Sequence, residues 1–467
     1  MKPSSSTSEH GTRTAAPREQ GTRSLWGTLF TDPDVDDETC DRAWLRAMLD
    51  FERALAIVQA RAGIVSQEAA RMVVTAIDVG NYDPVAIGQS ALASGTPVVP
   101  LVRAIGAHVT AEGRAAVHNG ATSQDVLDTA LSLVAHRALR PVLANLRGVA
   151  AECERLAERH RDTLVAGRTL NQHALPTTFG LKCAGWLVAV DEAEDALTRV
   201  RERRLAVQFG GAAGTLAAVR PDGDPTDVDL TAQLAAQLGL AAPLIPWHTD
   251  RTRVAELAAA LGETAGVLAK IAQDVVLLAQ TEVAEVAEGE GGTSSAMPHK
   301  QNPVRAVLVT ACARRVPGLV ATVLAAMAQE HERAAGAWHS EWQTVTELLR
   351  LVGGAALGTR ELLSRLRVDP GRMRRNLDLT GGLLMAENVA VRLAARIGRS
   401  EAQDLVAEVC RTAVAAGQSL REALLADLRI GLSEKEVDDA LDPAGYTGRA
   451  GEFTDRALAA HRGRTRP

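Results

Sequence analysis

Long stretches with apolar side chains at helical spacing fill the chain between residues 125 and 366. In the clearest of them, residues 251–287, Leu, Val and Ile recur every three or four positions and form one stripe. At 1.5 Å per residue, a helix of that length is about 50 Å long. Because strand signals are sparse and glycine-rich loops separate the stretches, the pattern predicts an all-α fold with a central bundle of five long helices. The five stretches are residues 125–160, 177–208, 251–287, 304–329 and 341–366.

The rest of the chain changes in character at three places. Residues 1–24 are polar and rich in Ser, Thr and Arg, which is typical of a disordered tail. Shorter helical patterns follow, and a Val-Asp-Pro-Gly break at residues 368–371 precedes another set of them. We therefore expect a three-domain subunit, with an N-terminal helical domain (25–121), the long-helix bundle (122–367) and a C-terminal helical domain (368–467).

Charge and cysteine usage exclude several classes of protein. Lys plus Arg number 51 and Asp plus Glu 57, a net charge of −6, whereas nucleic-acid binders usually carry a basic surplus. The five cysteines form no CxxC and no metal-ligand spacing, which suits a reducing cytoplasm. Charges interrupt the apolar runs short of the roughly 20 residues of a membrane span, and the N-terminus lacks the apolar stretch of a secretory signal. We expect a cytoplasmic protein without nucleic-acid or membrane partners.

A glycine-rich segment, residues 288–303, lies between two of the predicted long helices. Its glycines can expose backbone N–H groups, as an anion cradle requires. Paired hydroxyls follow at Ser294 and Ser295, then the point charge of Lys300 and the donor and acceptor groups of Asn302. As bare composition, this segment could also be a polar linker between helices.

The order of residues in this segment resembles a known signature. Ser-Ser-Ala-Met-Pro-His-Lys-Gln-Asn-Pro is similar to the signature loop of the fumarase/aspartase superfamily, also called the argininosuccinate/adenylosuccinate lyase superfamily. His-Asn-Gly-Ala-Thr-Ser-Gln-Asp (118–125) resembles its first conserved region, and residues 167–180 resemble its second. Three motifs in the right order are far more specific than one. The resemblance covers residues 25–460 and implies a homotetramer, active sites shared between three subunits, and neither a metal nor an organic cofactor.

Other segments narrow the resemblance to one branch. Residues 208–216, Pro-Trp-His-Thr at 246–249 and Gln-Glu-His-Glu-Arg at 329–333 resemble the 3-carboxy-cis,cis-muconate lactonizing enzyme branch, which resembles nitrosuccinate lyase. Members remove a proton beside one carboxylate and expel a group from the adjacent carbon, and we expect the partner of this chain to be a small dicarboxylate substrate. The carbanion is held as an aci-carboxylate, so the site needs a base and hydrogen-bond donors.

The resemblance implies a set of site residues. Ser294, three residues before Met297, matches the catalytic base, and Lys300 is expected to stabilise its alkoxide. The substrate-binding candidates are Thr96, Asn119, Thr122, Ser123, Asn171, Gln172, His248, Ser295, Met297, Asn302 and Arg333.

For several of these candidates, a purely structural role remains an open alternative. Thr122, Ser123 and Gln172 could be caps or turn residues, and His248 a buried core histidine. Arg333 could pair structurally with Glu332 or Glu341. The sequence favours Asp125 as a cap of the helix that follows it.

Leu170 departs from the family pattern. Relatives that expel an amine or hydroxide usually carry His directly after Gly-Arg-Thr, whereas this chain has Leu170, which cannot protonate a leaving group. His173 lies nearby, but we expect it at a helix start, where it could point elsewhere. The departing group should therefore be a weak base such as carboxylate or nitrite. This argues against aspartase, fumarase and adenylosuccinate lyase activities.

Two substrates survive, and charge favours one of them. Thr96, Asn119 and Asn171 are neutral where a tricarboxylate should want cations, and amides can donate to nitro or carboxylate oxygens. The leading hypothesis is β-elimination from nitrosuccinate to fumarate and nitrite. One alternative is a 3-carboxy-cis,cis-muconate cycloisomerase of aromatic (protocatechuate) catabolism. The other is an inactive structural family member, against which the retained Ser294, Lys300 and Asn302 argue.

Overall fold

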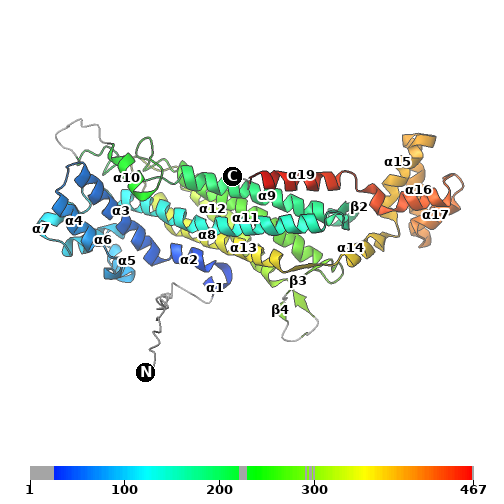
Figure 1. Cartoon of the computed structure of the whole chain (residues 1–467), viewed down its shortest axis with the longest axis horizontal. Helices are drawn as coiled ribbons and strands as arrows, with labels where there is room; N and C mark the ends of the chain where they lie inside the picture. The colour runs from blue at the N-terminus through cyan, green and yellow to red at the C-terminus, as the bar shows by residue number, and fades with distance from the viewer. Residues whose placement is uncertain (1–25, 220–228, 290–291, 294–296, 298–299, 465–467) are drawn as a thin grey trace, which may run out of the picture.

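The long axis of the molecule is set by its central helices. The computed structural model describes residues 26–219, 229–289, 292–293, 297 and 300–464, so the predicted tail lies outside the described residues. Figure 1 shows the long helices side by side, with the first short helices at one end and the C-terminal ones at the other. The predicted all-α fold is confirmed. The bundle consists of α8 (Ser123–Arg159), α9 (Phe179–Arg203), α11 (Thr252–Leu278), α12 (Val304–Ala325) and α13 (Ala337–Ser364).

One continuous apolar core joins these helices. α12 packs along both α11 and α13, and α8 packs along α9 and α13. α12 is the one described helix long and apolar enough, by length and composition, to cross a membrane, with a mean hydropathy of 1.6. The sequence led us to expect no such segment, because three arginines divide it. Only 28% of its most apolar window is buried within the chain, so much of its surface is uncovered in a single subunit.

Shorter helices form the two ends. The N-terminal ones are α1 (Gly27–Phe30), α2 (Pro33–Thr39), α3 (Asp41–Arg61), α4 (Gln67–Ala76), α5 (Pro84–Ala91), α6 (Val98–Ala107) and α7 (Ala111–Arg114); α10 (Leu230–Leu238) packs on α3. The C-terminal ones are α14 (Pro370–Leu377), α15 (Ala386–Ile397), α16 (Arg399–Ala416), α17 (Leu420–Ala426), α18 (Glu434–Leu441) and α19 (Ala450–Arg464).

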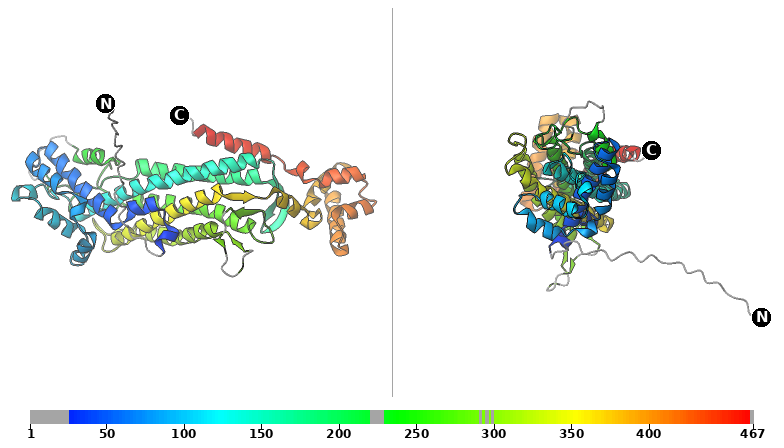
Figure 2. Two further views of the ribbon diagram at one scale, coloured as in Figure 1. Left: turned by 60° about the horizontal axis from the view of Figure 1, so that its bottom comes forward. Right: turned by 90° about the vertical axis from the view of Figure 1, so that its left-hand side faces the viewer.

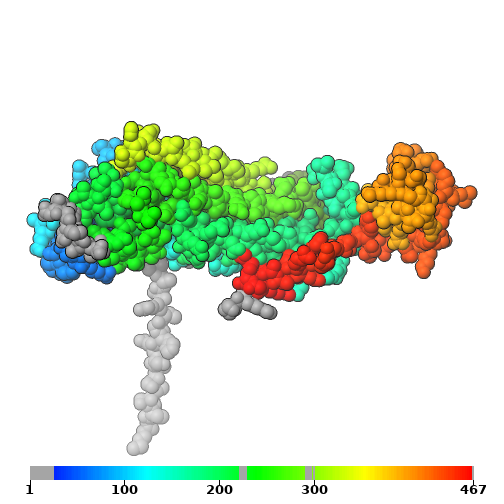
Figure 3. Space-filling view, turned by 90° about the horizontal axis from the view of Figure 1, so that it is seen from above, coloured from blue at the N-terminus to red at the C-terminus, as the bar shows by residue number. Residues whose placement is uncertain are grey.

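The C-terminal helices share an apolar cluster of their own, built by α15 to α18. α19 leaves this cluster and returns to pack on α9, as the left view of Figure 2 and the outer surface in Figure 3 show. We keep the three domains as a proposal, with α19 crossing back onto the central one.

Short antiparallel strand pairs connect the helices. The described pairs are β1 (Leu164–Thr169) with β2 (Gln172–Thr178), β3 (Val286–Glu288) with β6 (Leu366–Val368), and β4 (Gly292–Thr293) with β5 (Gln301–Asn302). The expectation that His173 lies at a helix start is wrong, because it lies on β2. Leu170 and Asn171 have φ angles of 51° and 62°, the paired left-handed conformation of a two-residue hairpin turn.

Candidate functional site

The first motif leads directly into the longest helix. Thr122 is the N-cap of α8, and its N–H donates to Asp125 Oδ2 at 3.0 Å, so the predicted capping role of Asp125 is confirmed. Thr122 and Ser123 are half-buried. They lie at the positive end of the α8 dipole, where an anion is favoured.

Asp125 also fixes a second segment against this helix end. Its two oxygens accept the N–H groups of Gly210 and Gly211 at 3.0 and 2.9 Å, and Oδ1 lies 2.7 Å from His248 Nε2. A Cβ on Gly210 would lie 2.9 Å from His248 Cε1, so this close approach requires glycine. His248 is only 5% exposed. The structure therefore places His248 in the buried, hydrogen-bonded position that was the alternative to substrate contact.

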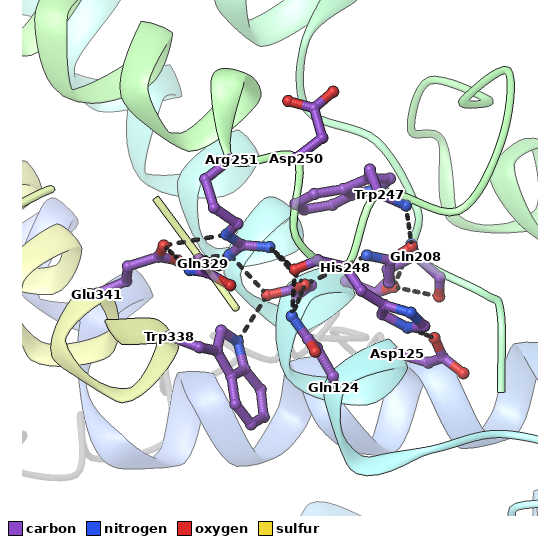
Figure 4. Close-up of polar contacts among 12 residues, drawn as sticks. Gln124, Asp125, Gln208, Trp247, His248, Asp250, Arg251, Gln329, Trp338 and Glu341 are labelled. Carbon is purple, nitrogen blue, oxygen red and sulfur yellow. Dashed lines mark hydrogen bonds and ion pairs between the residues drawn. The ribbon is translucent and has the colours of Figure 1, made fainter. Parts of the chain in front are cut away.

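The same region holds a buried charge cluster, which we define as Asp128, Arg251 and Glu341. Figure 4 labels Arg251 and Glu341 in it. Arg251 donates to both Asp128 oxygens at 2.8 and 3.0 Å, and its Nε donates to Glu341 Oε1 at 3.0 Å. All three side chains are at most 1% exposed. Burial raises the pKa of Glu341. Burial opposes the charge on Arg251, yet the two carboxylates raise its pKa above the ordinary value.

Further polar groups saturate this charge cluster. Trp338 Nε1 donates to Asp128 Oδ1 at 3.0 Å, and Gln329 Nε2 donates to Glu341 Oε1 at 3.0 Å. The Trp247 ring centroid lies 5.0 Å from the Arg251 guanidinium carbon. Two carboxylates share one guanidinium, so the charge cluster holds a formal charge of −1 when all three groups are ionised.

Arg333 reaches the same end of α8 from the loop between α12 and α13. Its Nε donates to Gln124 Oε1 at 3.2 Å and its Nη2 to the carbonyl of Ala212 at 3.3 Å. In the described part of the chain it forms no ion pair with Glu332 or Glu341, so that structural alternative is wrong. Glu341 is instead occupied by Arg251.

His118 is a residue that sequence reasoning missed. Its Nδ1 lies 2.7 Å from Glu52 Oε1, and its backbone N–H donates to Glu52 Oε2 at 2.9 Å. Burial lowers the pKa of His118, but the Glu52 carboxylate outweighs it, so the pKa lies above the ordinary value. The signal available was its place at the start of the first motif; Glu52, in α3, has no motif around it.

The side chains of Thr96 and Asn119 form hydrogen bonds with other protein groups. Asn119 Nδ2 donates to Gln59 Oε1 at 3.2 Å, and Gln59 Nε2 donates back to the Asn119 carbonyl at 2.8 Å. Thr96 is 8% exposed, and its hydroxyl accepts the N–H of Val98 at 3.3 Å. Within one chain, both side chains therefore already have a protein partner.

The second motif forms the β1–β2 hairpin at the opposite end of α8. Arg168 donates to both oxygens of the buried Glu285 at 2.9 and 2.7 Å, which anchors the hairpin. At its tip Leu170 is 97% exposed, and Asn171 and Gln172 are exposed as well. Burial lowers the pKa of His173, and its Nδ1 is a buried atom without a hydrogen-bond partner among the residues described.

The third motif lies between α11 and α12, beside the C-terminal end of α13. Ser294 and Ser295 lie outside the described residues. Met297 is 43% exposed, and its carbonyl accepts the N–H of the exposed Lys300 at 3.1 Å. Asn302 pairs with Gly292 across β4–β5.

Buried Glu288, at the start of this motif, accepts the N–H of Ala306 at 3.0 Å and that of Arg305 at 3.3 Å, which caps α12.

Within one chain the candidates therefore fall into separate groups. Thr122, Ser123, Asn119 and Arg333 gather at the start of α8, whereas Asn171 and Gln172 lie beyond its end. α8 has 37 residues, so the two groups are about 55 Å apart. The third group, Met297, Lys300 and Asn302, lies on the β4–β5 segment.

Comparison with known families matches most of the chain. The family described as "Lyase" matches residues 29–318, and the family described as "Adenylosuccinate lyase C-terminus" matches residues 382–457.

Individual relatives are similar over nearly their whole length. The 3-carboxy-cis,cis-muconate cycloisomerase of Pseudomonas aeruginosa is 48% identical over 429 residues, which cover 90% of this chain and 93% of the relative. The nitrosuccinate lyase of Streptomyces davaonensis is 46% identical over 437 residues, covering 91% and 92%. The crystal structure of 3-carboxy-cis,cis-muconate lactonizing enzyme from Pseudomonas putida aligns with a TM-score of 0.88 at 42% identity, covering 95% of this chain and all of that one.

Proposed function

The chain is an enzyme of the fumarase/aspartase superfamily of lyases, and we propose that it is a cycloisomerase that interconverts 3-carboxy-cis,cis-muconate and its lactone. The observation that carries this proposal is the near full-length similarity to cycloisomerases, in sequence at 48% identity and in a solved structure at a TM-score of 0.88. The order of the two substrate hypotheses is thus reversed relative to the sequence argument, which put nitrosuccinate first.

The reaction needs one proton transfer and one carbon–oxygen bond. In lactone formation a substrate carboxylate oxygen adds to a double bond, and the aci-carboxylate carbanion so formed takes a proton at carbon. In the reverse direction that proton is removed and the carboxylate departs. We assign the proton transfer to Ser294, with Lys300 and Asn302 holding the carboxylate that gains charge.

Cations near the start of α8 support a substrate with three carboxylates. Glu52 favours the charged imidazolium of His118 and balances its charge, whereas the Arg333 guanidinium is held by the neutral Gln124. Both lie at the positive end of α8. Because Thr96 and Asn119 are bonded to protein groups and His118 is paired with Glu52, we assign the recognition of charge to Arg333.

The leaving group also suits this reaction. Leu170 offers no proton at the position where relatives that expel amines carry histidine. A carboxylate departs without protonation, so lactone opening needs no acid there.

The separation of the motifs favours a shared active site. The start of α8 and the β1–β2 hairpin are about 55 Å apart in one chain, so one pocket can hold both only if different subunits contribute them. The uncovered apolar surface of α12 is suited to pack against another copy. We propose a homotetramer with each site drawn from three subunits, acting in the cytoplasm, where its five free cysteines stay reduced.

Nitrosuccinate lyase activity is the second candidate, because a relative with that name is 46% identical over 91% of this chain. Nitrite is likewise a weakly basic leaving group, and the products would be fumarate and nitrite.

Product analysis separates these readings. Purified protein is incubated separately with 3-carboxy-cis,cis-muconate and with nitrosuccinate, scoring lactone by loss of diene absorbance and nitrite by a colorimetric assay. We expect lactone and no nitrite. Nitrite with fumarate, and no lactone, would establish the second candidate, and neither product would indicate the inactive structural member.

A further inference from the structure

The loop that carries Arg333, residues 326–336, is tied to the buried charge cluster at two points. We call it the Arg333 loop. One tie runs from Arg333 through Gln124 to Asp128, and the other from Gln329 to Glu341. Asp128 and Glu341 are the two carboxylates bound by Arg251.

Gln124 is the central residue of the first tie. Its side chain is fully buried, and every polar group on it has a partner. Its Oε1 accepts from Arg333 Nε at 3.2 Å, while its Nε2 donates to the carbonyl of His248 at 2.7 Å and to Asp128 Oδ2 at 3.2 Å. A buried amide saturated in this way has one orientation, so it presents its oxygen to Arg333 in a fixed place.

Gln329 makes the second tie. Its Nε2 donates to Glu341 Oε1 at 3.0 Å, four residues before Arg333. Glu330 holds the same loop from within, because its Oε2 accepts the N–H of Ala335 at 3.2 Å. The backbone on both sides of Arg333 is thereby restrained.

The neutrality of Gln124 matters for what Arg333 can bind. A carboxylate in its place would form an ion pair with Arg333 and cancel its charge. The amide holds the guanidinium through a lone pair and leaves the full positive charge available. Gln124 follows Ser123 in the chain, so the held guanidinium lies at the start of α8, where the helix dipole favours the same anion.

We propose that Gln124 is a positioning residue, which holds the Arg333 guanidinium against the buried charge cluster so that Arg333 binds a substrate carboxylate. The proposal rests on the proposed function in taking the ligand to be a polycarboxylate. It goes beyond that function by assigning the charge cluster a part in substrate affinity as well as in folding.

Binding and turnover of four variants test this proposal. Gln124→Met removes the amide at similar volume, Arg333→Ala removes the cation, and the third variant combines both. Gln124→Glu replaces the neutral amide with a carboxylate that would pair with Arg333. Gln343→Met, at an exposed position on α13, is the matched control. The probe is propane-1,2,3-tricarboxylate, titrated calorimetrically into the full-length assembled protein, with melting curves to verify folding.

We expect Gln124→Met and Arg333→Ala each to weaken tricarboxylate binding about tenfold and to raise KM with little change in kcat, the pattern of lost ground-state binding. The double variant should be no weaker than Arg333→Ala, because both changes remove one interaction. Gln124→Glu should also weaken binding, because its carboxylate would cancel the charge of Arg333, and Gln343→Met should match the wild type.

Wild-type affinity in Gln124→Met, or independent losses that add in the double variant, would overturn the proposal. So would a wild type that does not bind the tricarboxylate. If Gln124→Met fails to fold, Gln124→Glu and Gln329→Met decide, each with an expected loss of affinity. A protein that binds the tricarboxylate through Gln124 but forms no lactone would refute the proposed function and leave this inference standing.

Discussion

Glu52 and His118 are joined twice, because one buried carboxylate accepts from both the ring and the backbone N–H of the histidine. This double contact holds His118 at a φ of 55°, a left-handed conformation uncommon for residues other than glycine. The surrounding structure therefore holds His118 in this conformation, and Glu52 favours the charged form of its imidazole.

The pH dependence of this pair has a definite sign. The pKa of His118 is raised in the folded state, so the stability it adds is fully present below the unfolded value near 6.5. That stability is lost as the pH rises through the folded-state pKa. KM for the carboxylate substrate should rise over the same range, as the imidazolium loses its proton. Glu52→Gln should shift both transitions to lower pH; histidine NMR titration and KM profiles measure them, and an unshifted transition would contradict this account.

Removing Arg251 should be strongly destabilising. Arg251→Met leaves two buried carboxylates without their cation, which typically costs about 3–5 kcal/mol of folding free energy. Adding Asp128→Asn and Glu341→Gln to Arg251→Met should recover part of that loss, because no buried charge then remains. Denaturant unfolding at one fixed protein concentration measures the three proteins. Equal stability of Arg251→Met and wild type would show that the charge cluster is not needed for folding.

Ser294→Ala should abolish most of the turnover while leaving the fold intact. Loss of a positioned proton-transfer group typically lowers the rate by about 10²–10⁴-fold. The check is kcat for lactone formation, with circular dichroism as the control for folding and Gln343→Met, at an exposed position on α13, as the control variant. Near-normal kcat in Ser294→Ala would refute the assignment.

Leu170→His restores the residue that amine-expelling relatives carry. Because a carboxylate leaves without protonation, the change should not raise kcat for the lactone reaction. Leu170 is 97% exposed in a single chain, so the melting temperature of the Leu170→His variant should differ little from that of the wild type. A large gain in kcat would show that protonation of the leaving group limits the wild-type reaction.

The long helices were readable from the sequence because their apolar side chains recur at the helical period over many turns. The helix predicted over residues 251–287 spans Thr252–Leu278, so its predicted end is too late and includes the first residues of β3, which begins at Val286. His173 was placed on a helix because the turn at Leu170 and Asn171 has no glycine, the usual sign of a tight hairpin.

The contacts that join distant parts of the chain could not be read in this way. Arg251 is 123 positions from Asp128 and 90 from Glu341, and no local pattern links them. Gln59 and Asn119 are 60 positions apart, so nothing in the first motif indicated that the Asn119 amide already has a partner. The motifs named candidate residues, whereas only the fold shows which of them are bound to other protein groups.

The length of α8 has a consequence for how the activity of this enzyme depends on protein concentration. Since the ends of that helix hold different motifs, the proposed shared site leaves an isolated protomer with parts of several pockets and no complete one. Dilution should therefore abolish catalysis, whereas the far-ultraviolet circular dichroism spectrum should remain that of a helical protein. Mixing two inactive variants, each substituted in a different motif, should restore part of the activity, because subunit exchange assembles some active sites from unsubstituted motifs only.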